Sequence, residues 1–308
     1  MDIHHSWAYE VLNENAKKKL DSGKLSFNDN ILECTINNSD SKEFHEKHTK
    51  GAFLRKFKEV KYHQVNWESP YYFKLFDKYL SGIDLSRITI LDFGCGDGRF
   101  TEYLLKKGAT RIISVDFDYK LLVELSSYIE STDNSDKVFL IHSDLANLPI
   151  KGESADVLLT IGVLYYYNEL YESCLGQLKA LLKQDGIFIT SDPNLEGFIL
   201  SALIFENLND ALDTFEQRRF NEVKGNNNLT FRAFTQNELK DIYNRSGFEI
   251  MDKQGITLFH KIVRILQLRG QISEADLEKN EERIKTLFDF LGEEGSLFKH
   301  LVWKLKKR

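Results

Sequence analysis

The chain has few cysteines, few prolines and no long apolar run. Its 308 residues include three cysteines, Cys34, Cys95 and Cys174, and three prolines. An odd number of widely spaced cysteines argues against a disulfide framework, and without a CxxC pair no cysteine zinc site is expected. No apolar run approaches the ~18–20 residues of a membrane span, and the first 20 residues lack a signal-peptide core. We therefore expect a cytoplasmic protein with no membrane span and no metal site.

An excess of positive charge is also absent. The formal net charge is −6 and the pI is about 5.8, so a nucleic-acid partner is not expected. What is present is a composition of 42% hydrophobic and 29% charged residues, which is ordinary for a globular protein with a large core. The length suggests one large domain, or one domain with additions.

One stretch, Ile88–Arg99 (ITILDFGCGDGR), organises the sequence. It begins as a short apolar strand and breaks into Gly94-Cys95-Gly96-Asp97-Gly98. A helical pattern follows at once. The glycines allow a sharp turn and the close approach of a ligand, and the start of the helix offers free N–H groups.

A second predicted strand, Arg111–Val115, ends at an acidic residue. Asp116 lies 22 residues after Gly94, close to the ~20 expected between a glycine turn and a carboxylate that holds ribose hydroxyls. Strands and helices continue to alternate along the chain, which predicts an α/β fold with a doubly wound sheet. A glycine-rich turn alone is weak support for a nucleotide site, but the second strand and its acid strengthen it.

Four segments resemble the class I S-adenosylmethionine-dependent methyltransferases. They are LDFGCGDG at 91–98, SVDFD at 114–118, HSDLANLP at 142–149 and ADVLLTIGVLYYY at 155–167, and the resemblance covers roughly residues 70–308. It implies a seven-stranded, mostly parallel Rossmann-like sheet, whose last strand is inserted antiparallel between the fifth and the sixth.

The resemblance also implies a binding site for S-adenosyl-L-methionine. Asp116 would accept from the ribose hydroxyls, Asp144 would accept from the exocyclic amine of adenine, and Leu145 would lie against the ring. The full set of cofactor-binding residues that we expect is Asp92, Gly94, Cys95, Gly96, Gly98, Asp116, Phe117, Ser143, Asp144, Leu145 and Ile161.

The sequence says less about the catalytic residues. Gly162–Tyr167 (GVLYYY) leaves the carboxyl end of a predicted strand, where ligands bind in open α/β sheets, and should face the transferred methyl. Methyl transfer from a sulfonium needs positioning and, for some nucleophiles, removal of a proton. Weak candidates for the base are His63, Tyr165, Tyr166 and His260. The Asn/Asp-Pro-Pro-Tyr signature of enzymes that methylate nucleic-acid bases is missing, which lowers support for DNA or RNA acceptors.

We divide the chain into an N-terminal prefix or lid region, 1–65, and a methyltransferase domain, 66–308. The stretch 24–35 predicts two short strands around an Asn-Asp-Asn turn. A mainly helical cap, with a flexible Gly-Asn run at 225–228, is expected at about 196–232. It is longer than an ordinary connection. A capping box opens a helix at Thr235, a further helix is expected at 273–291, and a last strand at 297–305.

The expected function is therefore methyl transfer to a small-molecule or glycan- or lipid-type acceptor, with the oxygen or nitrogen nucleophile unresolved. Two alternatives remain. A NAD(P)-dependent oxidoreductase also uses a glycine-rich α/β unit, but its dinucleotide-binding motif has Gly or Ala at the position of Arg99. A non-catalytic S-adenosylmethionine-binding module would keep the same cofactor residues. The oligomeric state is not readable from the sequence.

Overall fold

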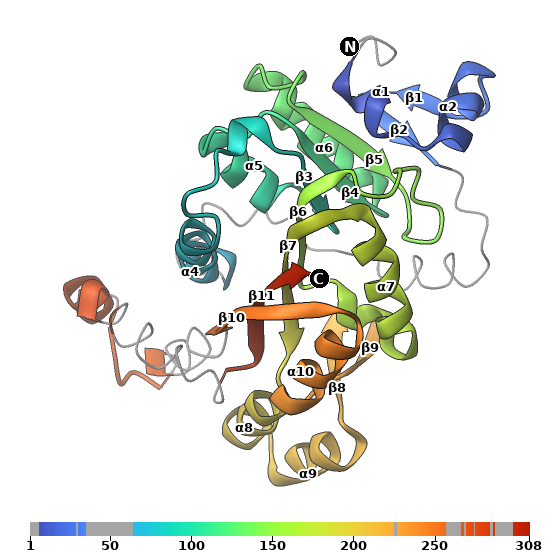
Figure 1. Ribbon diagram of the computed structural model, residues 1–308. Helices are drawn as coiled ribbons and strands as arrows, with labels where there is room; N and C mark the ends of the chain where they lie inside the picture. The colour runs from blue at the N-terminus through green and yellow to red at the C-terminus, as the bar shows by residue number, and fades with distance from the viewer. Residues whose placement is uncertain are drawn as a thin grey trace.

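A computed structural model describes residues 6–28, 30–34, 64–224, 227–256, 266–267, 269–273, 275–283, 286 and 298–308. Its centre is a nine-stranded sheet in the order β1-β2-β5-β4-β3-β6-β7-β11-β10 (Figure 1). A separate two-stranded hairpin, β8–β9, lies beside η4.

Five parallel strands form the middle of the sheet and lead to one carboxyl edge. They are β5 (Val138–His142), β4 (Ile112–Asp116), β3 (Ile90–Phe93), β6 (Ala155–Ile161) and β7 (Leu182–Pro193). Their residues are almost all buried, as expected for strands that are covered on both faces. The carboxyl edge of such a sheet is where polar groups can meet a ligand.

The last strand confirms the predicted antiparallel insertion. β11 (His300–Lys307) lies between β7 and β10 (Phe248–Ile256) and is antiparallel to both. It begins at His300 instead of residue 297, and β7 begins at Leu182, directly after the preceding helix. The predicted Rossmann-like, mostly parallel α/β sheet with an N-terminal prefix is thereby confirmed, with two additional strands at one edge.

Helices cover both faces of the sheet. One face carries α1 (Trp7–Val11), α2 (Glu14–Asp21), α7 (Tyr171–Leu181) and α10 (Gln236–Arg245), and the other carries α4 (Gln64–Tyr79), α5 (Arg99–Lys106) and α6 (Tyr119–Ser131). Successive strand residues alternate between the two cores; in β6, Val157 and Leu159 pack on one side and Leu158 on the other. This period of two is the strand geometry that the apolar pattern requires.

The two additional strands come from the N-terminal region. β1 (Ser26–Asn28) and β2 (Ile31–Glu33) form the short pair predicted at 24–35, and β2 pairs in parallel with β5. Within β2, Ile31 belongs to one core and Leu32 to the other, and both are fully buried. Residues 26–33 therefore extend the main sheet.

The insertion after β7 contains two helices and a hairpin. α8 (Leu195–Phe205) and α9 (Leu208–Gln217) pack against each other, followed by β8 (Arg219–Lys224) and β9 (Asn227–Arg232). The helical part matches the apolar series in the sequence. The hairpin was not predicted, because the Gly-Asn run suggests a flexible loop when the flanking residues do not alternate strictly.

The capping box at Thr235 is confirmed. Its hydroxyl accepts from the backbone N–H of Glu238, and that side chain returns to the Thr235 N–H. Of the helix expected at 273–291, residues 275–283 and 286 are helical, and the others after 283 lie outside the described residues. No helix among the described residues is long and apolar enough to cross a membrane.

Candidate functional site

The glycine turn joins β3 to α5 at the carboxyl edge. Gly94, Gly96 and Gly98 all have positive φ, at 77°, 57° and 91°. The N–H groups of Gly94 and Cys95 both donate to the carbonyl of Val115, at 2.8 and 3.0 Å, so the turn folds back over β4. Left-handed backbone at three positions explains why the sequence uses glycine there.

Asp116 is built into this turn. It ends β4, it is buried, and its carboxylate accepts from the N–H groups of Gly96 at 2.7 Å and of Asp118 at 2.9 Å. Burial nevertheless raises the pKa of Asp116 to about 6. The backbone fixes the carboxylate at the end of the strand, where further lone pairs remain for a ligand.

Asp144 follows β5 and has one satisfied and one unsatisfied oxygen. Its Oδ1 accepts from the backbone N–H and the side-chain amide of Asn147, at 2.9 and 2.8 Å. Its Oδ2 is buried and has no hydrogen-bond partner among the residues that the structure describes. A buried carboxylate oxygen without a donor is costly, so this atom fits an incoming N–H group.

A pocket connects these residues. Its empty volume is about 320 Å³, and its lining combines the turn, the ends of β4 and β5, and the loop after β6: Phe93, Gly94, Val115, Asp116, Phe117, Ser143, Asp144, Val163, Tyr166 and Tyr167. Five of the predicted cofactor residues, Gly94, Asp116, Phe117, Ser143 and Asp144, are among them. The structure thus brings together the ends of three strands that the sequence singled out.

The other predicted cofactor residues lie around this pocket without lining it. Leu145 is buried, Ile161 is partly buried at the end of β6, and Gly96 has open space where a Cβ would point. Cys95 is buried among apolar side chains, and burial holds the pKa of its thiol well above the usual range. Their predicted contacts with a cofactor stay predictions.

Asp92 forms a buried polar link beneath the turn. It accepts from the hydroxyl of Thr101 at 2.8 Å, and that hydroxyl also lies 2.8 Å from the Ser114 hydroxyl. Burial raises the pKa of Asp92 to about 7. The link joins β3, β4 and α5, and so supports the turn from below.

Among the candidate bases, Tyr165 and Tyr166 can be placed, whereas His63 and His260 lie outside the described residues. The two tyrosine rings stack at 4.7 Å, and Tyr166 lines the pocket. The Tyr165 hydroxyl lies 3.8 Å from the position that a Cβ on Gly162 would take. Both tyrosines therefore stand beside the end of β6.

The apolar wall that Phe93 and Val115 give the pocket, from β3 and β4, is one feature that the sequence did not mark. Val163 and Tyr167 also line the pocket, and both belong to the loop Gly162–Tyr167 that we expect to face the transferred methyl. A Cβ on Gly94 would come within 2.3 Å of Val163.

Arg99 is a second missed residue. It begins α5, and its guanidinium lies over the rings of Phe100 and Tyr72, at 4.3 and 4.9 Å from their centroids. Its Nε is buried without a hydrogen-bond partner, and within the described part of the chain Arg99 forms no ion pair. A cation of this kind beside the turn is available to an anionic group.

The insertion is fastened to the loop that carries the tyrosines. Asn168 has a positive φ of 45°, its amide donates to the Thr230 carbonyl, and its side-chain oxygen accepts from the Arg232 N–H. Arg219 pairs with Glu169 at 2.6 Å. The hairpin therefore holds η4 (Leu164–Leu170), which contributes two residues to the pocket wall.

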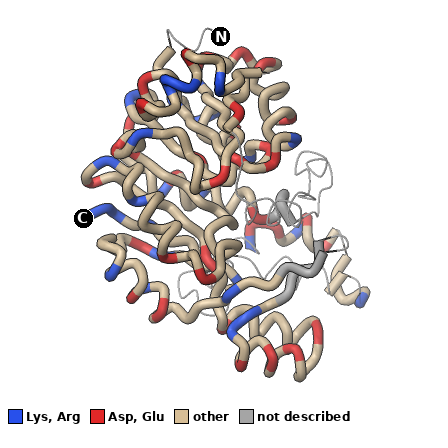
Figure 2. The backbone as a smooth tube through the Cα atoms, turned by 90° about the vertical axis from the view of Figure 1, so that its right-hand side faces the viewer, with Lys and Arg blue, Asp and Glu red and all other residues tan. Residues whose placement is uncertain are grey.

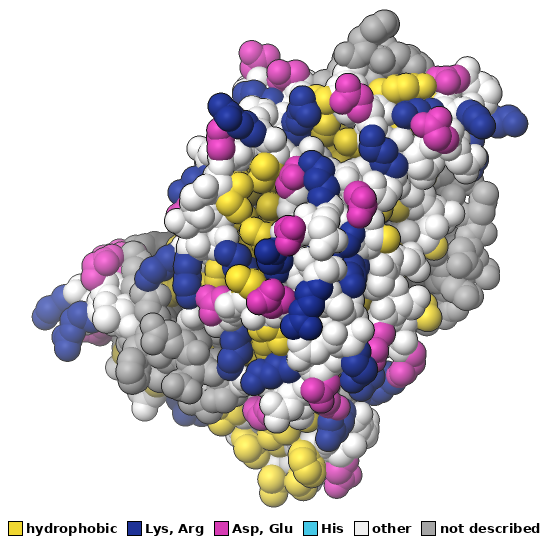
Figure 3. Space-filling model, in the orientation of Figure 1, with side chains coloured by type: hydrophobic (Ala, Val, Ile, Leu, Met, Phe, Trp, Pro, Cys, Tyr) yellow, Lys and Arg dark blue, Asp and Glu magenta, His cyan; other side chains and the backbone are white. Residues whose placement is uncertain are grey.

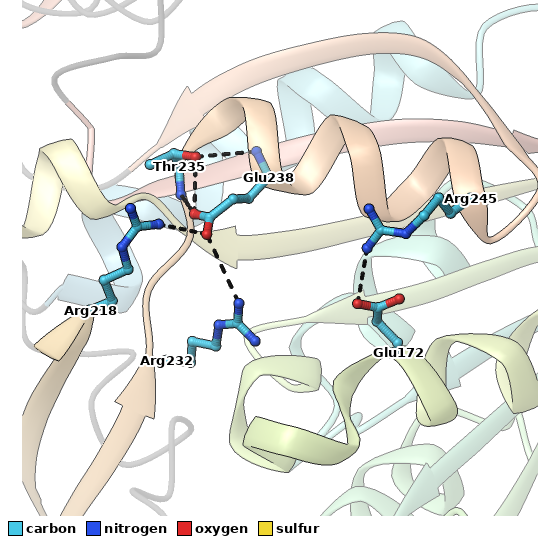
Figure 4. A network of polar contacts seen from close by, with 6 residues as sticks. All are labelled: Glu172, Arg218, Arg232, Thr235, Glu238 and Arg245. Atoms are coloured by element: carbon cyan, nitrogen blue, oxygen red, sulfur yellow. Dashed lines mark hydrogen bonds and ion pairs between the residues drawn. The ribbon is translucent and has the colours of Figure 1, made fainter.

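One carboxylate holds both ends of the hairpin. Glu238 pairs with Arg218 at 2.6 Å and with Arg232 at 4.0 Å, while it also completes the capping box with Thr235 (Figure 4). Arg218 has a positive φ of 52° at the end of α9. A separate pair, Arg245–Glu172, joins α10 to α7 in the same view.

Known proteins match this arrangement in sequence. A family model described as a methyltransferase domain matches residues 90–186. The ribosomal protein L11 methyltransferase of Actinobacillus succinogenes is 31% identical over 94 residues, which are 30% of this chain and 31% of that protein. The tRNA U34 carboxymethyltransferase of Shewanella frigidimarina is 26% identical over 133 residues, which are 43% and 39% of the two chains. The chain thus spans less than half the length of these relatives.

Solved structures match over more of the chain. A magnesium protoporphyrin IX methyltransferase from Synechocystis PCC 6803, with bound S-adenosylhomocysteine, has a TM-score of 0.55 at 14% identity and covers 88% of this chain and 100% of its own. A putative S-adenosylmethionine-dependent methyltransferase from Listeria monocytogenes has a TM-score of 0.55 at 15% identity, with 78% and 98% covered. Residues 90–186 thus match a methyltransferase domain, and the fold of the chain is that of the class I S-adenosylmethionine-dependent methyltransferases.

Proposed function

We propose that this chain transfers a methyl group from S-adenosyl-L-methionine to a small organic acceptor. The observation that carries the proposal is the pocket in which Asp116 and the unsatisfied Oδ2 of Asp144 lie together beside the glycine turn. A nucleoside offers a pair of ribose hydroxyls, from which the remaining lone pairs of Asp116 can accept, and one exocyclic amine, from which the Oδ2 of Asp144 can accept.

Different pocket residues contact different parts of the cofactor in this proposal. Asp116 holds the ribose, Asp144 receives the adenine amine, and Leu145 with Phe117 bounds the ring. Hydrogen bonds to a charged acceptor contribute roughly 1.5–3 kcal/mol each. Asp92, Gly96, Gly98 and Ile161 complete the cradle that the turn and the end of β6 provide.

Arg99 accounts for the anionic end of the cofactor. It stands at the first position of α5, and its guanidinium is held in place by two aromatic rings. The start of the helix and the unpaired cation both favour a carboxylate. We assign this residue to the carboxylate of the methionine part.

In the proposed reaction no side chain has to form a covalent bond with the substrate. The bound cofactor supplies a methyl on a positive sulfur, and the chain has to place the acceptor in line with it. Tyr166 forms one wall of the pocket, and Tyr165 lies beside the end of β6, so the loop after β6 orients the acceptor. The hairpin, fastened to this loop through Asn168, closes the acceptor side. In this scheme residues 196–232 act as the cap of the domain 66–308, and residues 1–65 are its prefix.

A labelling experiment tests the acceptor class. The purified chain is incubated with methyl-labelled S-adenosylmethionine and with separated small-molecule, protein and tRNA fractions of a cell extract. Label in the small-molecule fraction is expected, because the chain has a net charge of −6 and no basic excess for nucleic acid. Label in protein or in tRNA, on which the sequence relatives act by name, would overturn the small acceptor.

A binding experiment tests the cofactor against the oxidoreductase alternative. Calorimetry compares S-adenosylhomocysteine with NADH on the native chain, and we expect heat of binding from the first alone. Binding of NADH alone would refute the proposal. Binding of S-adenosylhomocysteine with no transfer to any fraction would leave a cofactor-binding module without catalysis.

A further inference from the structure

The end of the insertion that is farthest from the sheet carries an apolar surface which the proposed chemistry does not use. It consists of Leu203, Ile204, Leu208, Leu212 and Phe215, with exposed fractions of 51, 43, 62, 46 and 60%. We call these five residues the tip patch. They appear as the yellow area at the bottom of Figure 3, over α8 and α9. Only two other large apolar side chains, Leu170 and Met251, are as exposed in the described part of the chain.

The two helices differ from ordinary surface helices. Residues 197–205 (GFILSALIF) contain no charge, and the apolar residues of α8 surround the helix. In α9, Leu208, Leu212 and Phe215 follow the helical spacing and form one exposed stripe, whereas Ala211 and Thr214 face inward. A surface helix normally turns its apolar stripe to a core. Here the stripe faces solvent, and contiguous exposed patches of this kind mark contact sites.

The charges around the patch restrict what can cover it. Glu206, Asp210, Asp213 and Glu216 are exposed on α9 and on the turn before it, and no lysine occurs between Lys183 and Lys224. Lys299, which comes from another part of the chain, lies over the ring of Phe198 near the other end of α8. The two arginines at the end of α9 are already paired, Arg218 with Glu238 and Arg219 with Glu169. An anionic surface would therefore be repelled, and a symmetric pair of chains would bring two acidic clusters together.

The size and shape of the patch point the same way. Five half-exposed side chains present on the order of 500 Å² of apolar surface, whereas a stable protein–protein interface buries about 800 Å² per partner. The helices pack mainly against each other and form the end of the molecule that projects away from the sheet (Figures 1 and 3). A projecting apolar end can enter a soft surface without needing a matching groove.

The patch is also continuous with the acceptor side of the proposed active site. Phe198 of α8 stacks on Phe220 of the hairpin at 3.7 Å, Phe220 contacts Phe231 at 5.2 Å, and Phe231 contacts Tyr166 at 4.6 Å. Aromatic rings thus run from the pocket wall to the base of α8. A surface that docks on this helix stands at the outer end of that series.

We propose that the tip patch docks on an electrically neutral lipid surface. Leu208, Leu212 and Phe215 enter the interface between headgroups and acyl chains, with Leu203 and Ile204 beside them, and the acidic residues stay in water. The attraction is hydrophobic and not electrostatic. The docking itself does not depend on methyl transfer; only its use, the delivery of an apolar acceptor, rests on the proposed function.

Flotation with lipid vesicles tests the docking. The native chain is mixed with vesicles of phosphatidylcholine, with vesicles in which a third of the lipid is phosphatidylglycerol, and with no lipid. We expect partition onto phosphatidylcholine and weaker partition onto the anionic vesicles. The double variant Leu208→Gln/Phe215→Gln should lose at least tenfold in partition, since each side chain gives up apolar burial.

A matched control uses the two exposed apolar residues elsewhere. Leu170→Gln/Met251→Gln removes as much exposed apolar surface, from η4 and β10, and should partition like the native chain. Equal loss in both variants, stronger binding to anionic vesicles, or no partition of the native chain would each overturn the proposal. A native dimer in sedimentation equilibrium that Leu208→Gln/Phe215→Gln dissociates would show instead that a second copy covers the patch. Vesicle binding with no S-adenosylhomocysteine binding would leave the docking intact and remove the proposed function.

Discussion

The two sides of the carboxyl edge are built differently. On the cofactor side, buried polar atoms are held by hydrogen bonds: the carboxylate of Asp116 accepts two backbone N–H groups, and Asp92, Thr101 and Ser114 form one linked set. On the cap side, the insertion leaves five large apolar side chains exposed on two helices. Along the backbone of the described residues, basic and acidic positions are interspersed (Figure 2).

This difference follows from what each side of the edge is proposed to bind. A nucleoside has fixed donors, so a site for it needs fixed acceptors, and three strand ends supply them at positions that the backbone dictates. A cap has to admit an acceptor and release a product, and its contacts can be fewer. It is held instead at a few points, by Asn168 at the loop after β6 and by Glu238 at the base of the hairpin.

The largest expected effect is on the cofactor side. Asp116→Ala removes the acceptor that we propose for both ribose hydroxyls, so S-adenosylhomocysteine should bind roughly tenfold to a few thousandfold more weakly. Calorimetry measures this, with circular dichroism as the check on folding. Asp144→Ala is the matched comparison and should lose less, because it meets one amine. An Asp116→Ala protein that is folded and binds with native affinity would contradict the assignment of the ribose site.

The second prediction separates the cap from the cofactor site. Replacing residues 196–229 by a short Gly-Ser linker should leave S-adenosylhomocysteine affinity within about threefold, because no pocket residue lies in that segment. Turnover should fall by at least about a hundredfold, since positioning of the acceptor is lost. Glu238→Gln is the milder variant, because it weakens only the pairs that hold the hairpin. Intact turnover after the replacement would show that the segment does not gate the acceptor.

The sequence predicted more of the cofactor side than of the cap side. The glycine turn, Asp116 and Asp144 were readable because left-handed backbone requires glycine and because strand ends in this fold have fixed neighbours. Arg99 was not, since its contact is made across the fold, with Tyr72 from α4.

The additions to the fold were harder to read. The two strands at 26–33 were predicted as a pair, but their partner β5 lies more than 100 residues away and no local signal names it. The hairpin after α9 is fixed by Asn168 and Glu238, again from other elements. Local patterns specify turns and apolar faces, whereas the choice of partner depends on the whole chain.

The third prediction sharpens the assignment within the cofactor side. Arg99→Met removes the charge that we place on the carboxylate of the methionine part, and the aromatic contacts can persist with a long apolar side chain. S-adenosylhomocysteine should bind about tenfold more weakly, whereas 5′-methylthioadenosine, which lacks the carboxylate, should bind the variant and the native chain equally. Parallel weakening of both ligands would mean that Arg99 only supports the turn.

The last prediction concerns stability, at the point where the sheet meets the cap. Asp192, near the end of β7, is fully buried and accepts hydrogen bonds from Tyr171, at 2.7 Å, and from Tyr243, and no described residue forms an ion pair with it. The two tyrosines come from α7 and α10, so this carboxylate joins three elements directly before the insertion begins. Burial raises the pKa of Asp192 to about 6 from the ordinary value of 3.8.

Because the pKa of Asp192 is higher in the folded chain, ionisation of this carboxyl lowers the free energy of unfolding, in full above about pH 6. This penalty is lost below about pH 4, where the carboxyl is protonated in the folded chain. The native chain should therefore gain, relative to Asp192→Asn, about 2 kcal/mol of unfolding free energy between pH 7.5 and pH 4.5. Urea unfolding at both pH values measures the difference, and Asp133→Asn, which removes an exposed carboxylate, serves as the control. A difference between native and Asp192→Asn that does not change with pH would show that Asp192 titrates as it does in the unfolded chain. The buried hydrogen bonds of Asp192 would then carry no electrostatic cost. The difference between the hydrogen-bonded cofactor side and the cap would in that case begin at the hairpin β8–β9.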